Sequence, residues 1–177
     1  LNNLAGAKWI CQNMGVDEAD FYEAIATFKG ASKRLEKIAE TKTAVAYKDF
    51  AHSPSKVKAT TEAVKAQYPN RKLVACLELH TYSSLNAEFL KEYEGALDAA
   101  DVAVVFYSPD AVKIKQLEEV TYEQISEAFN RKDLIIYTNP EEFKEFLKEH
   151  DLKESALLLM SSGNYGGLNF DEIQGLL

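Results

Sequence analysis

The chain has 177 residues, of which 20 are Lys or Arg and 28 are Asp or Glu, so its net charge is −8 at pH 7. This length predicts one ordinary domain with a short appended segment, and the acidic balance opposes non-specific binding to nucleic acid or anionic membranes. The sequence opens without a start Met, a basic leader or a long apolar run. We therefore expect no signal peptide and no membrane span, and we expect a piece of a longer protein.

The two cysteines, Cys11 and Cys76, lie far apart and in no C-x-x-C motif. We interpret them as buried free thiols in a reducing compartment, which predicts a cytoplasmic protein. The three histidines are scattered and match no zinc-binding spacing, so no metal site is predicted.

The amino-terminal part of the chain has two helical patterns. Residues 4–14 carry apolar side chains at helical spacing and end at Gly15, and Asp17 can cap a second helix that runs to Phe28. Small residues and the adjacent cations Lys33 and Arg34 then interrupt the periodicity over residues 28–34, which is typical of a linker or hinge. We place a domain boundary there, between a helical segment at 1–33 and a main domain at 34–177.

Apolar runs alternate with helical patterns through the main domain. We predict strands at about 43–48, 72–78, 101–107, 133–138 and 156–160, and helices at 55–67, 85–97, 121–130, 140–150 and 170–177. Residues 108–121 fit a short edge strand or a loop. Parallel neighbours need crossovers of this length, so the predicted fold class is α/β. The expected architecture is a three-layer α/β/α, Rossmann-like, mainly parallel sheet of about six strands.

Asp49 and His52 lie in the turn that joins the first predicted strand to the next helix. Ligands of open α/β sheets bind at the carboxyl ends of the strands. An aspartate there can accept hydrogen bonds from ribose hydroxyls, and a histidine can lie against a base or a phosphate. The alternative is an Asx turn with a surface histidine.

Two further polar segments follow predicted strands. Residues 78–84 are rich in hydrogen-bonding groups, which suits a specificity surface and also a helix cap. The turn at 163–167 lacks the spacing of a nucleotide fingerprint, but its N–H groups can hold a carboxylate or phosphate, or its glycines simply permit a tight turn. A triad of Ser83, His52 and Asp49 has no G-x-S-x-G elbow to support it.

Together these segments resemble the carboxyl-terminal part of the Mur ligases, an ATP-dependent family that joins amino acids or peptides to UDP-muramic acid. Residues 3–7 resemble the end of the family's H-N-x-x-N motif, residues 28–34 resemble F-x-G-x-x-R-R with Lys33 in place of the first Arg, and residues 49–54 match D-(Y/F)-(A/G)-H-(H/S/T)-P. Residues 77–83 stand where muropeptide-type members have F-E-P-R-S-x-T. Residues 160–167 match their M-S-(N/S)-G-x-(F/Y)-x-G. The match is therefore to the muropeptide-ligase branch, which joins L-alanyl-γ-D-glutamyl-meso-diaminopimelate to UDP-N-acetylmuramate.

The resemblance implies that ATP phosphorylates the muramoyl carboxylate and that the peptide amine attacks the acyl phosphate. It implies ATP contacts for four residues, Asn3, Arg34, Asp49 and His52. It implies substrate contacts for a second set, His80, Thr81, Tyr82, Ser83, Ser84, Gly163, Asn164 and Tyr165.

The family's P-loop and magnesium ligands belong to a central domain, and this sequence includes neither of them. The resemblance assigns residues 1–33 to the helical tail of that central domain and residues 34–177 to the carboxyl-terminal domain. ATP and Mg²⁺ are then bound mainly by the central domain, and we expect this chain alone to be inactive. The implied partners are UDP-N-acetylmuramate, the peptide, and the N-terminal and central domains.

His80 stands where the family has an arginine, so a side chain that titrates near neutrality replaces a fixed cation. Recognition of a peptide carboxylate at this position therefore stays open, and Arg34 or the Gly163 turn can carry it instead. Two alternatives remain. A UDP-N-acetylmuramate–L-alanine ligase shares the D-F-A-H motif, and a non-catalytic flavodoxin-like binding module shares the fold class, although Asp101 begins its strand rather than ending it.

Overall fold

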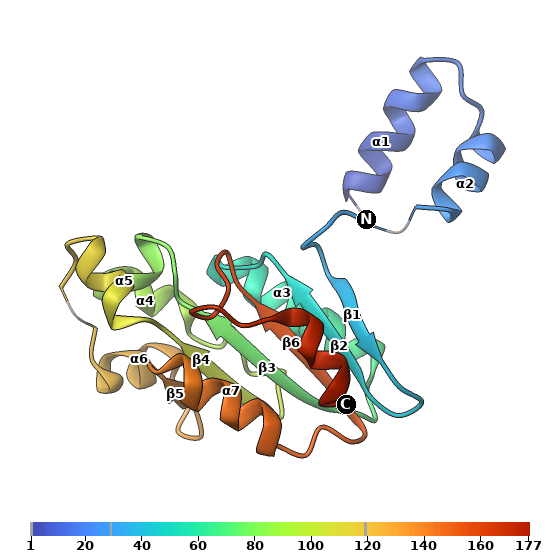
Figure 1. Ribbon diagram of the computed structural model, residues 1–177. Coiled ribbons are helices and arrows are strands. Elements are labelled where there is room, and N and C mark those ends of the chain that lie inside the picture. Colours follow the sequence, from blue (N-terminus) through green and yellow to red (C-terminus); the bar gives the residue numbers. More distant parts are fainter. Residues whose placement is uncertain (1, 29, 119) are drawn as a thin grey trace. The chain divides into compact units, whose positions relative to one another are not determined.

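Figure 1 shows the computed structural model, which describes residues 2–28, 30–118 and 120–177. The chain divides into two compact units, Leu1–Ala31 and Ser32–Leu177. The first unit is helical, and the second contains the sheet.

The N-terminal unit consists of helices α1 (Asn2–Asn13) and α2 (Glu18–Ala26). Gly15, with a φ of 91°, lies in the turn between them, and the Asp17 carboxylate accepts a hydrogen bond from the N–H of Asp20 at 2.9 Å. Both predicted helices form, although α2 ends at Ala26 and not at Phe28.

The C-terminal unit is built on a sheet whose order is β1-β2-β6-β3-β4-β5, six strands among the residues that the structure describes. β1 pairs with β2 antiparallel, and the other pairs are parallel. The strands are β1 (Glu36–Glu40), β2 (Val45–Asp49), β3 (Lys72–Glu78), β4 (Val102–Phe106), β5 (Ile135–Tyr137) and β6 (Ser155–Met160). The predicted mainly parallel sheet is therefore confirmed.

Helices cover both faces of the sheet, because the side chains of each strand alternate between them. On one face, Tyr47, Leu77 and Val105 pack into a core with residues of α3 (Pro54–Gln67), α4 (Ala87–Leu90) and α6 (Tyr122–Phe129). On the other, Cys76 and Phe106 pack into a second core with residues of α7 (Pro140–Glu149) and the 3-10 helix η3 (Phe170–Gly175). The three-layer architecture is confirmed (Figure 1).

Two parts of the sheet prediction were wrong. The described residues of 108–118 and 120–121 contain helix α5 (Pro109–Ile114) and no strand. The helix starts there because the Ser108 hydroxyl accepts from the N–H of Ala111 at 3.3 Å and Pro109 occupies the first turn. The strand that the sequence analysis missed is β1, which lies at one edge of the sheet, next to β2. β1 has only five residues, and three of them, Glu36, Lys37 and Glu40, are charged, as is usual for an edge strand.

Two predicted helices are shorter or less regular than expected. Residues 85–97 are broken into η1 (Ser83–Leu85), α4 and η2 (Lys91–Tyr93), because the Asn86 side chain accepts from two following N–H groups and starts a new helix. The closing helix is the 3-10 helix η3. In the described parts of the chain, no helix has the length and apolarity that a membrane span requires.

Candidate functional site

The carboxyl ends of β2, β6 and β3 form one edge of the sheet. Asp49, the last residue of β2, is in register with Met160 of β6, and Met160 is in register with Leu77 of β3. The segments that follow these strands therefore leave from the same edge (Figure 1). They contain the predicted nucleotide turn, the glycine-rich turn and the 78–84 loop, three stretches that are far apart in the sequence.

Asp49 fastens the chain segment that precedes β1. One carboxylate oxygen accepts from the N–H of Leu35 at 2.6 Å, and the other accepts from the N–H of Ala51 at 2.7 Å. The N–H of Phe50 donates to the carbonyl of Lys33 at 2.9 Å. The Asx turn considered from the sequence is present, and the aspartate also holds the hinge segment against the end of β2. Each oxygen keeps a second lone pair for a ligand.

We expect the Asp49→Ala variant to lower the free energy of unfolding of the C-terminal unit by about 2 kcal/mol, because two backbone N–H groups lose their acceptor. Asp49→Asn keeps one acceptor oxygen and should lose about half as much. Urea denaturation followed by far-UV circular dichroism measures both. The matched control is Asp98→Ala, at an exposed aspartate. Equal stability of the Asp49→Ala and Asp98→Ala variants would show that the Asp49 hydrogen bonds do not stabilise the unit.

Arg34 and His52 both contact the Phe50 ring. The Arg34 guanidinium is 5.4 Å from the ring centroid, and the His52 ring meets Phe50 edge-on at 5.1 Å. His52 Nδ1 is 2.8 Å from the Phe50 carbonyl, which can only accept, so Nδ1 carries the proton and Nε2 is left as an acceptor. The structure thus brings Arg34, Asp49 and His52 together around one turn. Asn3 lies in α1, in the N-terminal unit, and its predicted role stays a prediction.

A buried carboxylate joins the other two loops. Glu78 ends β3 with a side chain only 2% exposed, and one of its oxygens accepts from the Ser161 hydroxyl and, at 2.9 Å, from the N–H of Tyr165. The other oxygen is 3.5 Å from Nδ1 of His80, whose side chain is 41% exposed. Gly163 donates its N–H to the Ser161 oxygen at 2.6 Å. The sequence analysis did not assign Glu78 or Ser161 to the site; an acid that ends an apolar strand was the available signal.

Tyr165 has no exposed side chain at the turn, and its predicted substrate contact stays a prediction. It is fully buried, and its hydroxyl donates to the carbonyls of Cys76 at 2.8 Å and Met160 at 2.9 Å. Burial raises the pKa of Tyr165 well above its ordinary value, so the hydroxyl stays a donor. Tyr165 is part of the core, and its hydroxyl contacts tie the glycine-rich turn to β3 and β6.

The 81–84 loop divides into inward and outward residues. The side chains of Thr81 and Ser84 bond each other at 3.0 Å, and Ser84 is buried. The side chains of Thr81 and Ser84 therefore stabilise the turn through hydrogen bonds inside the loop. Tyr82 and Ser83 are exposed, and the Lys115 ammonium lies 5.4 Å from the Tyr82 ring centroid. Of the predicted substrate residues in this loop, His80, Tyr82 and Ser83 are the most accessible.

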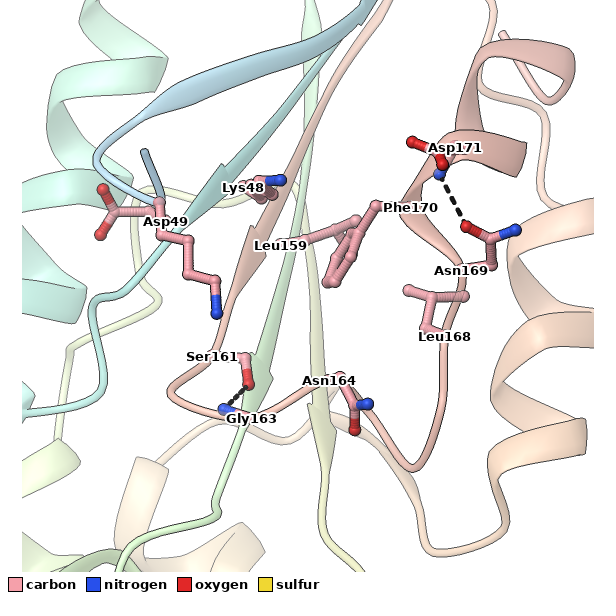
Figure 2. A pocket seen from close by; sticks show the side chains of 11 residues that line it. Lys48, Asp49, Leu159, Ser161, Gly163, Asn164, Leu168, Asn169, Phe170 and Asp171 are labelled. Carbon is pink, nitrogen blue, oxygen red and sulfur yellow. Dashed lines mark hydrogen bonds between the residues drawn. The ribbon is translucent and has the colours of Figure 1, made fainter. Parts of the chain in front are cut away.

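A cavity of about 330 Å³ opens beside the glycine-rich turn. Figure 2 shows side chains of β2, β6 and the segment after β6 around it. Asp49, Gly163 and Asn164 of the predicted site line it, together with Lys33 and Lys48, which the sequence analysis did not assign. Lys48 pairs with Glu36 at 3.3 Å.

No group of three or more Asp, Glu, His or Cys side chains in the described ranges is arranged to hold a metal ion. The site therefore consists of hydrogen-bonding groups, two lysines, an exposed arginine and two histidines at the edge of a parallel sheet. Such a site suits anionic and polar organic ligands, which defines an α/β ligand-binding domain.

Comparison with known proteins identifies the family to which this ligand-binding domain belongs. The model of the Mur ligase, glutamate ligase domain, matches residues 33–163, and the chain therefore belongs to the Mur ligase family of ATP-dependent ligases. It is 30% identical over 136 residues to the UDP-N-acetylmuramate–L-alanine ligase of Lactococcus lactis subsp. cremoris, a match that covers 76% of this chain and 30% of that protein. The chain thus spans about a third of the length of the curated relatives it matches.

Solved structures share the fold. The UDP-N-acetylmuramate–alanine ligase MurC of Thermotoga maritima has a TM-score of 0.70 at 18% identity, covering 92% of this chain and 34% of that one. The murein peptide ligase of Psychrobacter arcticus has a TM-score of 0.63 at 19% identity, covering 99% and 34%. These likenesses concern the fold. The curated relative is named an L-alanine ligase, so the predicted muropeptide-ligase branch is not confirmed.

Proposed function

We propose that this chain is the carboxyl-terminal domain of a ligase that joins the carboxylate of UDP-N-acetylmuramate to the α-amine of L-alanine or of an L-alanyl peptide, at the expense of ATP. The observation that carries the proposal is the convergence of the Asp49–Pro54 turn, the 78–84 loop and the 161–167 turn at one edge of a Mur ligase domain. The family membership favours this function over a non-catalytic flavodoxin-like module.

In the proposed reaction the γ-phosphate of ATP passes to the muramoyl carboxylate. The amine then attacks the carbonyl carbon of the acyl phosphate, phosphate leaves, and an amide forms. Arg34 is exposed and suits a phosphate, because its guanidinium donates two parallel hydrogen bonds. Asp49 has lone pairs for a ribose hydroxyl, and His52 Nε2 is an open acceptor. Asn3 is proposed to contact adenine.

Magnesium is proposed to be held by the central domain, because the described residues of this chain show no carboxylate cluster for it. Residues 1–33 are proposed to be the helical tail of that domain and residues 34–177 the carboxyl-terminal domain. Large apolar side chains exposed in the N-terminal unit, Trp9, Ile10 and Met14, suit packing against another part of the enzyme. We propose a cytoplasmic location for the whole enzyme.

The amine substrate has two candidates that share an L-alanyl α-amine. L-alanine is favoured by the name of the curated relatives. The tripeptide L-alanyl-γ-D-glutamyl-meso-diaminopimelate is favoured by the 160–167 motif and by the cavity, since Lys33 and Lys48 can face its additional carboxylates. His80, Tyr82, Ser83, Gly163 and Asn164 are the proposed substrate contacts.

The test supplies the full-length enzyme with ATP, Mg²⁺ and UDP-N-acetylmuramate, and then with either L-alanine or the tripeptide. ADP release and the mass of the UDP-linked product identify the amine that is used. We expect amide formation with one of the two, and no turnover by the 177-residue chain alone. Failure with both amines would overturn the proposed reaction, and turnover by the isolated chain would overturn its supporting role.

A further inference from the structure

Glu78 is a buried carboxylate that contacts two different loops. Its side chain is 2% exposed, and its Oε2 accepts from the Ser161 hydroxyl and the N–H of Tyr165. Two donors hold this oxygen in place, so the carboxylate cannot turn without leaving them unpaired. The remaining oxygen, Oε1, faces the His80 ring.

The His80 ring is held on one side by Glu78 and the Gly163 turn. Its Nδ1 lies 3.5 Å from Glu78 Oε1, and a Cβ placed on Gly163 would be 3.1 Å from its Cγ and Nδ1. The ring edge that carries Cγ and Nδ1 therefore packs against the buried carboxylate and the glycine. The side chain is 41% exposed. We infer that the accessible edge is the opposite one, which carries Nε2, because the edge with Cγ and Nδ1 is covered by Glu78 and Gly163.

We propose that Glu78 is a positioning residue for the amine substrate: it directs Nδ1–H of His80 toward itself, leaves Nε2 facing the substrate, and holds the Gly163 turn against the ring. The inference rests on the proposed function and adds a residue to it. A carboxylate has only acceptor atoms, so the neutral imidazole facing it carries its proton on Nδ1. Nε2 is then an acceptor for the N–H groups of the substrate amine, and a protonated ring keeps its carboxylate partner.

The Glu78→Gln variant distinguishes a role in orienting His80 from a purely structural role of Glu78. To keep the two donors paired, its carbonyl oxygen must take the place of Oε2. Its NH₂ group then faces His80 Nδ1, which must become an acceptor. The Glu78→Gln variant thus keeps the shape of the site but should move the proton of the neutral ring from Nδ1 to Nε2.

Long-range proton–nitrogen NMR of the 177-residue chain measures the tautomer of His80 directly. We expect the neutral ring to be the Nδ1–H form in the unsubstituted chain and the Nε2–H form in Glu78→Gln. Ser161→Ala removes a hydrogen bond to Glu78 but leaves the carboxylate beside His80, so it should keep the Nδ1–H form. Glu145→Gln, at an exposed glutamate of α7, is the matched control.

Kinetics of the full-length enzyme provide the second readout. Glu78→Gln should raise KM for the amine by about tenfold or more, by analogy with residues that orient a metal-binding histidine, whose loss costs about tenfold or more in affinity. KM for ATP and for UDP-N-acetylmuramate should stay within about twofold, since those ligands do not depend on His80. Glu145→Gln should change none of the three constants.

The two readouts separate this inference from the proposed function. An Nε2–H tautomer in the unsubstituted chain, or an unchanged tautomer in Glu78→Gln, overturns the positioning role even if the enzyme is a ligase. A switch of tautomer in Ser161→Ala also overturns it, because the loop rather than the carboxylate would then set the proton. An enzyme that ligates neither amine overturns the proposed function, whatever the tautomer of His80.

Discussion

Replacing Tyr165 with alanine is expected to lower the free energy of unfolding of the C-terminal unit by about 4 kcal/mol, which is typical of truncating a large buried aromatic residue. The Tyr165 ring is fully buried and stacks on Phe143 with ring centroids 4.9 Å apart and an interplanar angle of 14°. Its hydroxyl serves two backbone carbonyls, of Cys76 and Met160. The variant leaves a cavity and removes the hydroxyl hydrogen bonds to these carbonyls of β3 and β6.

Urea denaturation followed by far-UV circular dichroism measures this loss. Fluorescence is unsuitable, because the single tryptophan, Trp9, lies in the N-terminal unit. Tyr165→Phe keeps the ring and should cost only about 1–2 kcal/mol. Tyr122→Ala, at a half-exposed tyrosine, should cost within about 0.5 kcal/mol. A Tyr165→Ala variant as stable as Tyr122→Ala would show that Tyr165 is not the core anchor of the glycine-rich turn.

Gly163→Ala is the second large effect that we expect. The new Cβ would lie 2.8 Å from Glu78 Oε2 and 3.1 Å from the His80 ring. Because Glu78 is held by Ser161 and Tyr165, it cannot move aside cheaply. We expect a loss of about 2 kcal/mol of stability, as for other overpacked sites, and about a tenfold drop in kcat/KM for the amine in the full-length enzyme.

A double-mutant cycle identifies the clash as the cause. Glu78→Ala removes the obstructing carboxylate, so Gly163→Ala should cost at least about 1 kcal/mol less in that background than alone. Gly175→Ala is the matched control, since a Cβ there would meet nothing within 4 Å. Additive effects of Gly163→Ala and Glu78→Ala would contradict the proposed contact.

The sequence predicted the parallel strands well, because each is a short run rich in apolar residues with turn signals beside it. β3 was predicted at its observed bounds, Lys72–Glu78. The sequence prediction failed at β1, whose five residues include three charged side chains. It also failed at 108–121, where the buried side chain of Val112 is compatible with a strand or with a helix. In both places the local pattern is too short to decide between periods of 2 and 3.6 residues.

The sequence by itself determined the family resemblance, the fold class and the turns at the ends of the strands, because these depend on residue order and local periodicity. Only the tertiary structure decided what each polar residue in those turns does. Tyr165, predicted to bind substrate, is a core residue, and Glu78, which was not assigned, joins two loops. The physical reason is distance along the chain: Glu78 meets its partners Ser161 and Tyr165 across 83 and 87 residues, which no local pattern records.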